Sequence, residues 1–266
     1  MIRKKYCITA STAILILLLS APFSHSDDTL VADYGQTVAP KQTNEITMVA
    51  EEVIISVDDH VDKNIAVFPL RLAKVKCTFL FRNDTDKLIE AIVGFPGNEQ
   101  STASGYSWPI TDFVTVIDGE RLIINTKKEI LKEYKKDNVQ IFRNWYTWAM
   151  KFPPKSTVKV ENTYRHFLGA PLGMGYDPLY LNYELSTGAN WKGKIGKATI
   201  KVIYKNEEEL RKRICEIKPK GWIRRKNEII WDMKDIEPTE ADNIKVCERN
   251  LGYPVAEGIP LLFKKK

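Results

Sequence analysis

Two histidines, His60 and His166, follow the segment 1–26, and a nucleophilic active site would need one of them. A serine or cysteine nucleophile is activated by a neighbouring base, most often histidine. His166 alternates with Tyr164 along a strand-like segment, which favours a packed side chain over a general base. The sequence also lacks a G-x-S-x-G elbow and an H-E-x-x-H motif. It therefore predicts neither a serine hydrolase nor a zinc peptidase.

Segment 58–62 gathers four side chains that can ligate metals, namely Asp58, Asp59, His60 and Asp62. It lacks the glycine and the distal glutamate of an EF-hand loop. Polar turns between strands have the same composition, so we expect no metal and no cofactor. A pair of carboxylates could still hydrolyse a wall polymer, but 34 Asp and Glu residues leave the pair undefined.

Aromatic residues form the best candidate binding surface. On a strand, Trp145 and Trp148 would face opposite sides, and both sides are buried only if each is covered. Exposed rings can stack on sugars or anchor a protein partner, whereas the alternative is that they fill a core. More rings follow a glycine-rich loop over 168–178. The candidate surface comprises Phe142, Trp145, Trp148, Tyr176, Tyr180 and Trp191.

The elements that would position these residues are mainly strands. Alternation of apolar and polar residues is clear over 65–82 and 158–166. Asp118-Gly119 and Lys226-Asn227 lie between β-prone runs and predict hairpins. Strands and helices do not alternate regularly. We therefore expect a mostly β fold, an antiparallel β-sandwich with two short helices.

The first helix is expected over 125–137, where Ile130 and Tyr134 are four positions apart among lysines and glutamates. Its lysines are expected to form a solvated face, and binding of an acidic partner is the alternative. The second helix is expected over 206–214, with Asn206 as its N-cap and three glutamates in its first turn.

Three cysteines, Cys77, Cys215 and Cys247, follow the segment 1–26. An odd number in an exported protein leaves at least one thiol free or bonded to another chain. Cys77 shares a strand face with Val75 and Phe79, so we expect a buried thiol. Cys215 and Cys247 could form a disulfide in an oxidising compartment, or remain reduced.

The segment 1–26 has the pattern of a secretory signal peptide. Basic residues at positions 3–5 precede an apolar run, and Ser24 and Ser26 suit a cleavage site directly after Ser26. We therefore expect export to the periplasm or the medium, with a retained N-terminal anchor as the alternative. Cleavage lowers the formal net charge from +6 to about +3, which gives no electrostatic reason to expect a nucleic-acid partner.

The remaining chain divides into three parts by composition. Residues 27–45 are expected to be a loosely ordered lead-in, and residues 46–205 the sandwich core. Residues 206–266 are expected to add a helix and a β-hairpin packed on that core. After the signal peptide, no segment is long and apolar enough to span a membrane.

The segment 185–198 carries the pattern L-x-T-G-A-x-W-x-G-x-I-G-x-A. With Phe152-Pro153-Pro154 and Gly94-Phe95-Pro96, it resembles a bacterial secreted family known only as a domain of unknown function. The resemblance covers residues 46–205. It implies export and a β-rich fold, and it supplies no catalytic residues. A structural interpretation of the pattern is that its glycines form a turn and that Trp191 covers one end of the core.

Taken together, the residues favour a non-catalytic binding or accessory module of the cell envelope, with an envelope protein or a glycan as its partner. One alternative is an extracytoplasmic hydrolase that uses carboxylates. Another is a structural envelope protein whose chains are joined through a thiol.

Overall fold

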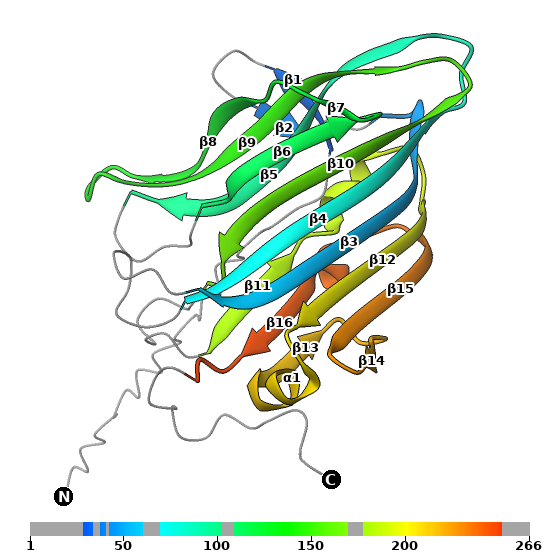
Figure 1. Cartoon of the computed structure of the whole chain (residues 1–266). Coiled ribbons are helices and arrows are strands. Elements are labelled where there is room, and N and C mark those ends of the chain that lie inside the picture. The colour runs from blue at the N-terminus through cyan, green and yellow to red at the C-terminus, as the bar shows by residue number, and fades with distance from the viewer. Residues whose placement is uncertain are drawn as a thin grey trace, which may run out of the picture.

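The structure is a computed structural model that describes residues 29–33, 38–40, 43–60, 70–102, 109–169 and 178–251. Its elements are mainly strands (Figure 1). The strands are β1 (Thr29–Asp33), β2 (Val38–Pro40), β3 (Ile46–His60), β4 (Leu70–Asn83), β5 (Ile89–Ser101), β6 (Thr111–Ile117), β7 (Glu120–Arg121), β8 (Asn125–Tyr134), β9 (Val139–Phe152), β10 (Ser156–Phe167), β11 (Leu179–Tyr183), β12 (Ile195–Tyr204), β13 (Ile214–Lys218), β14 (Ile223–Arg225), β15 (Glu228–Ile236) and β16 (Ile244–Glu248). The helical elements are η1 (Ser186–Asn190), α1 (Glu207–Arg213) and η2 (Glu240–Asp242).

The described strands form three sheets. A large sheet has the order β14-β15-β12-β3-β4-β10-β6-β7, a second has β2-β1-β5-β9-β8, and a small one has β11-β16-β13. Strand β12 pairs with β3 in parallel, and the other pairings between described strands are antiparallel. The expected mostly β, sandwich-like fold is confirmed. No described helix is long and apolar enough to cross a membrane.

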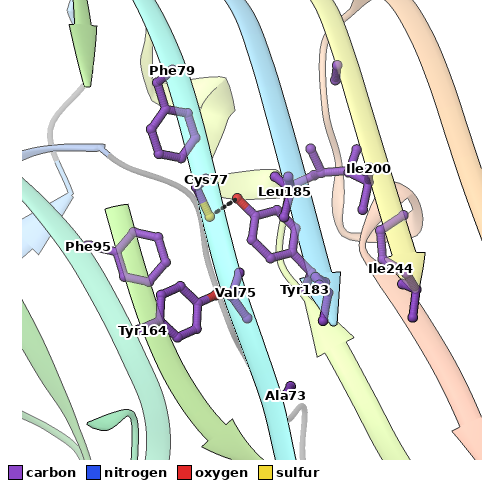
Figure 2. Close-up of a cluster of buried hydrophobic side chains, with 14 of the residues drawn as sticks. Ala73, Val75, Cys77, Phe79, Phe95, Tyr164, Tyr183, Leu185, Ile200 and Ile244 are labelled. Atoms are coloured by element: carbon purple, nitrogen blue, oxygen red, sulfur yellow. Dashed lines mark hydrogen bonds between the residues drawn. The ribbon is translucent and has the colours of Figure 1, made fainter. Parts of the chain in front are cut away.

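The core lies between the large sheet and the two others. The Phe95 ring on β5 lies 5.2 Å from the Tyr164 ring on β10, so the second sheet covers one part of the inner face. Tyr183 on β11 reaches Cys77 on β4, so the small sheet covers another part (Figure 2). The large sheet is thus one layer of the sandwich, and the other two sheets share the opposite layer.

Strict alternation sets which side chains enter this core. Val158, Val160, Tyr164 and His166 on β10 are buried, and the residues between them are more exposed. Asn162 lies in the same inward row, and its carboxamide oxygen accepts a 2.9 Å hydrogen bond from the Thr115 hydroxyl. The predicted inward face of this strand is therefore confirmed.

Of the two predicted helices, one is present, and the prediction of the other is wrong. Helix α1 begins after Asn206, whose side chain accepts a hydrogen bond from the Glu209 backbone N–H at 2.8 Å, as the N-cap prediction requires. Residues 125–134 instead form strand β8, paired with β9. A spacing of four fits a helix and a regular strand alike, because positions four apart share a face in both. In β8 the register shift between Ile130 and Lys132 places Ile130 and Tyr134 on opposite faces. Pairing with β9 decides the outcome.

The predicted hairpins are present. Asp118 and Gly119 have φ values of 49° and 89° between β6 and β7, a conformation that Asp-Gly pairs favour. Lys226, with φ of 51°, lies between β14 and β15. Within the segment 27–45, which was expected to be loosely ordered, β1 and β2 pair with each other and β1 also pairs with β5.

Cys215 and Cys247 form a disulfide, with Cα atoms 5.4 Å apart, that joins β13 to β16. Cys77 is buried, as its strand position predicts. No described thiol is therefore exposed for bonding to another chain. The proposal that chains are joined through one of these three cysteines is not favoured by this arrangement.

A bulge in β3 changes which residues face the core. The register with β4 shifts between Met48 and Ala50, so that Met48 and Glu51 both face inward. Strand β12 passes close to this bulge at Gly196. A Cβ atom placed on Gly196 would lie 2.7 Å from the Val49 carbonyl oxygen, so only glycine fits without movement of the backbone.

We predict that Gly196→Ala destabilises the fold, because the added methyl group collides with the backbone of the bulge. The free energy of unfolding should fall by about 1–3 kcal/mol, as for other overpacked sites. Chemical denaturation monitored by circular dichroism measures this. Thr199→Ala, on the same strand and facing outward, is the matched control. Equal stability of the two variants would contradict the close approach.

Candidate functional site

Three of the rings that were candidates for a binding surface lie in the interior. Trp145, Trp148 and Trp191 are at most 3% exposed. Both sides of β9 are covered: the Trp148 ring lies 6.2 Å from Phe113, and the Trp145 indole N–H donates to Glu129 at 2.7 Å. The prediction of a surface is therefore wrong for these three residues, and the alternative that they fill the core is correct.

Trp191 packs against Phe81, with ring centroids 4.3 Å apart. Two other candidates, Phe142 and Tyr180, are half-buried at the surface. Lys128 lies over the Phe142 ring at 4.0 Å, and Lys245 lies over the Tyr180 ring at 4.4 Å. Their faces are thus occupied by cations of the same chain.

Tyr176 and residues 170–177 of the glycine-rich loop lie outside the described residues. In the candidate metal segment 58–62, Asp62 lies outside the described residues. Asp59 binds two arginines, Arg71 and Arg213. The described residues contain no cluster of three or more metal-ligating side chains.

His166 is buried on the inner face of β10, with Nδ1 3.1 Å from the Phe167 carbonyl oxygen. Burial lowers the pKa of His166 to about 4, because the charged imidazolium loses its hydration. The side chain is therefore neutral at physiological pH. This agrees with the packed histidine that the sequence indicates.

A buried arginine organises one end of the sandwich. Arg71 on β4 is 1% exposed, and its guanidinium binds carboxylates from three other elements. The distances are 3.0 Å to Glu248, 2.8 Å to Glu209 and 3.0 Å to Asp59. These carboxylates raise the pKa of Arg71 despite its burial, so the side chain keeps its charge. The sequence gives no signal for this cluster, because Arg71 and Glu248 are 177 positions apart.

Two further side chains complete the buried ionic cluster. Arg213 at the end of α1 binds Asp59 at 3.1 Å and Glu209 at 3.3 Å. The Tyr204 hydroxyl on β12 donates to Glu248 at 2.7 Å. The cluster therefore connects the large sheet, the small sheet and α1. The charges of the cluster are paired with one another, which indicates a structural role, although Arg71 Nη2 is buried without a hydrogen-bond partner among the described residues.

A second buried acid lies in the middle of the core. The Tyr183 hydroxyl donates to Glu51 Oε1 at 2.8 Å and lies 3.7 Å from the Cys77 sulfur (Figure 2). Glu51 Oε2 is buried without a hydrogen-bond partner among the described residues. Burial raises the pKa of Glu51 to about 7, and the bond from Tyr183 offsets only part of this shift.

A third cluster lies across β5, β9 and β8, where Glu99, Arg143 and Glu129 are direct cross-strand neighbours. Arg143 donates to Glu99 at 3.2 Å. Burial raises the pKa of Glu99 and of Glu184, and the charge of Arg143 opposes the shift in both. These are the described carboxyls, besides Glu51, whose pKa values are raised.

No described element covers the outer face of the large sheet, and Figure 1 shows none in front of β3, β4, β10 and β12. Cross-strand register places its charges in rows that we call the charge stripes. Asp232, Glu52 and Glu161 form an acidic stripe, separated by Thr199 and Thr78. Basic stripes lie two positions away along the strands on either side, one with Lys197 and Lys159 and the other with Lys201 and Lys76.

The charge stripes are linked by ion pairs. Glu161 binds Lys76 at 2.9 Å and Lys159 at 3.3 Å, and Glu52 binds Lys201 at 2.8 Å. The hydrogen bond from Lys76 lowers the pKa of Glu161. Two adjoining hollows, of about 440 and 580 Å³, lie on this face. The sequence contains the signal for this surface, as alternating charged residues on several strands, but not the register that aligns them.

Comparison with solved structures finds a similar fold. A Legionella pneumophila protein, described as a candidate nutrient binding protein, matches with a TM-score of 0.60 over 85% of this chain and 70% of its own, at 19% sequence identity. A variant of an M1 zinc metallopeptidase from Deinococcus radiodurans matches with a TM-score of 0.36 and 9% identity over 78% of this chain and 43% of its own. A score this low does not indicate a shared fold. No family model and no curated protein matches the sequence.

We predict that Arg71→Met costs about 3–5 kcal/mol of the free energy of unfolding, because Glu248 is then a buried charge without its cationic partner. The double variant Arg71→Met, Glu248→Gln should recover part of that loss, because it removes the stranded charge. Urea denaturation of the native chain, the single variants Arg71→Met and Glu248→Gln, and the double variant measures this. A loss for the double variant equal to the sum of the two single losses would show that the pair is not coupled.

Glu51 should make stability depend on pH. Folding raises the pKa of Glu51 from 4.5 to about 7, so the folded chain holds this proton more tightly than the unfolded chain. The stabilising contribution is therefore present below pH 4.5 and is lost as pH rises to 7. Glu51→Gln stays neutral, so its advantage over the native chain should grow across this window to about 3 kcal/mol. Denaturation at several pH values tests this. The exposed Glu52→Gln should show no such growth.

Proposed function

We propose that this chain is an exported, non-catalytic binding module of the cell envelope. We further propose that it recognises a protein partner through the charge stripes of the large sheet. The export part depends on the signal-peptide pattern of the segment 1–26. The Legionella protein of similar fold is itself described as a candidate binding protein, which agrees with a binding role.

The observation that carries the proposal is the contrast between the two faces of the large sheet. Its inner face is covered by the other sheets, and Arg71 and Glu248, like Tyr183 and Glu51, bind each other there. Its outer face, which no described element covers, is hollowed and charged. This outer face therefore offers the ordered, accessible surface on which a partner could be recognised.

The chemistry of the charge stripes favours a protein over a glycan. The stripes contain no aromatic ring on which a sugar could stack. They present an acidic row between two basic rows, which suits a surface with the opposite order of charges. Such complementarity contributes mainly to specificity and to the rate of association, because each ion pair must be exchanged for another.

The hydrolase alternative has one observation in its favour. Glu99 and Glu184 have raised pKa values near Arg143, and a proton-holding carboxyl is what general acid catalysis requires. If either acted in this way, Glu99→Gln or Glu184→Gln would abolish turnover of a wall polymer. If the chain is instead a binding module, both variants should still bind the partner.

We predict that Glu161→Lys abolishes capture of the partner from an envelope extract, because it breaks the acidic stripe between Lys76 and Lys159. Immobilised native and variant chains are compared, with bound proteins identified by mass spectrometry. Glu90→Lys is the matched control, because it breaks an exposed pair with Lys151 on a different sheet. Both changes should alter stability by less than about 1 kcal/mol.

Capture of the same proteins in equal amounts by both variants would contradict the use of the charge stripes. If a glycan is recovered with the native chain and lost with Glu161→Lys, the charge stripes would still be the binding surface, but the proposal of a protein partner would be contradicted.

A further inference from the structure

Strand β8 is an edge strand of the second sheet. Among the described strands it pairs with β9 and with no other. Figure 1 shows the β8–β9 hairpin projecting beyond the neighbouring strands at the left of the view. An edge strand carries backbone N–H and C=O groups that can pair with an added strand, and most of the residues of β8 are exposed.

Apolar side chains are exposed along the outer half of this strand. Ile130, Leu131 and Tyr134 are 39–44% exposed, and Ile123, just before the strand, is 87% exposed. The register with β9 shifts between Ile130 and Lys132, so adjacent apolar residues are displayed at the bulge. Contiguous exposed apolar residues on an edge are a mark of an interaction site.

The cations of this hairpin differ from those of the charge stripes. Lysines of the stripes such as Lys76 and Lys201 bind carboxylates. Among the described residues, no carboxylate pairs with Lys132, Lys135 or Lys136. Lys132 instead lies over the Tyr134 ring at 4.6 Å.

The two glutamates of β8 are already engaged by neutral donors. Glu129 accepts from the Trp145 indole at 2.7 Å, and Glu133 accepts from the Gln140 carboxamide at 2.9 Å. With these carboxylates counted, the edge still has an excess of basic residues. Over residues 125–138, five lysines outnumber two glutamates and one aspartate.

We propose that β8 docks an extended, acidic segment of a partner protein by strand addition, with its backbone pairing along the free edge. Apolar side chains of the segment would contact the exposed apolar residues, which the bulge places on both faces of β8. Its carboxylates would bind Lys132, Lys135 and Lys136. A second copy of β8 would bring like charges together, which disfavours self-pairing. The tip, residues 135–138, is polar and charged, so it is not suited to insertion into a membrane.

The test uses the purified full chain and a labelled, end-capped decapeptide of alternating glutamate and valine. We expect saturable binding by fluorescence anisotropy that weakens with added salt, and new amide hydrogen-exchange protection in residues 130–134. The same peptide with lysine in place of glutamate should not bind. These readouts need no variant of the protein.

The double variant Lys132→Glu, Lys135→Glu should bind the acidic peptide at least about tenfold more weakly. Lys74→Glu, on the large sheet, is the matched control and should bind as the native chain does. Equal affinity for a glutamate–glycine peptide, binding of the lysine peptide, or binding without protection of β8 would overturn the proposal. So would a dimer of the native chain in which β8 is already protected. This surface is on a different sheet from the charge stripes, so each proposal can fail without the other.

Discussion

The fold depends on the need to satisfy one buried cation. A guanidinium taken out of water costs several kcal/mol unless carboxylates surround it, and Arg71 obtains these from β3, α1 and β16. Each partner can reach Arg71 only when its own element is docked. Binding to Arg71 therefore fixes the positions of α1, the small sheet and the end of β3 relative to one another. The ionic cluster fixes the relative placement of layers whose apolar surfaces alone could pack in several ways.

The bulge of β3 is a second constraint, and it acts through side-chain direction. One extra residue exchanges the faces of the strand, so that Glu51 points into the core while Val53 keeps the inward position that pairs with β4. The close approach of Gly196 to the Val49 carbonyl oxygen allows β12 to follow this bend. Gly196 therefore has a steric reason to be glycine, whereas at Gly193 the reason is a φ of +66°.

The sequence pattern correctly predicted those features that depend on residues close together in the chain. The alternation over 158–166, the Asp118-Gly119 turn and the Asn206 cap were correct, because each depends on residues close in sequence. The segment 125–137 was assigned to the wrong element, because a spacing of four is compatible with helix and strand alike and only β9 distinguishes them. The burial of both Trp145 and Trp148 could not be known without the sheets that cover β9. The clusters around Arg71 and across the charge stripes depend on register between distant strands, which no single segment encodes.

The order of the partners along the chain has a consequence for synthesis. Arg71 is made early, whereas Glu248 belongs to the last described strand, beside the cysteine that closes the disulfide. During synthesis Arg71 can meet Asp59 at once and Glu209 later, but its full set of three carboxylates is complete only when β16, the last described strand, has emerged. A product that stops short of β16 would not be a smaller version of this sandwich, because Arg71 would have lost the only fully buried carboxylate that binds it in the described chain.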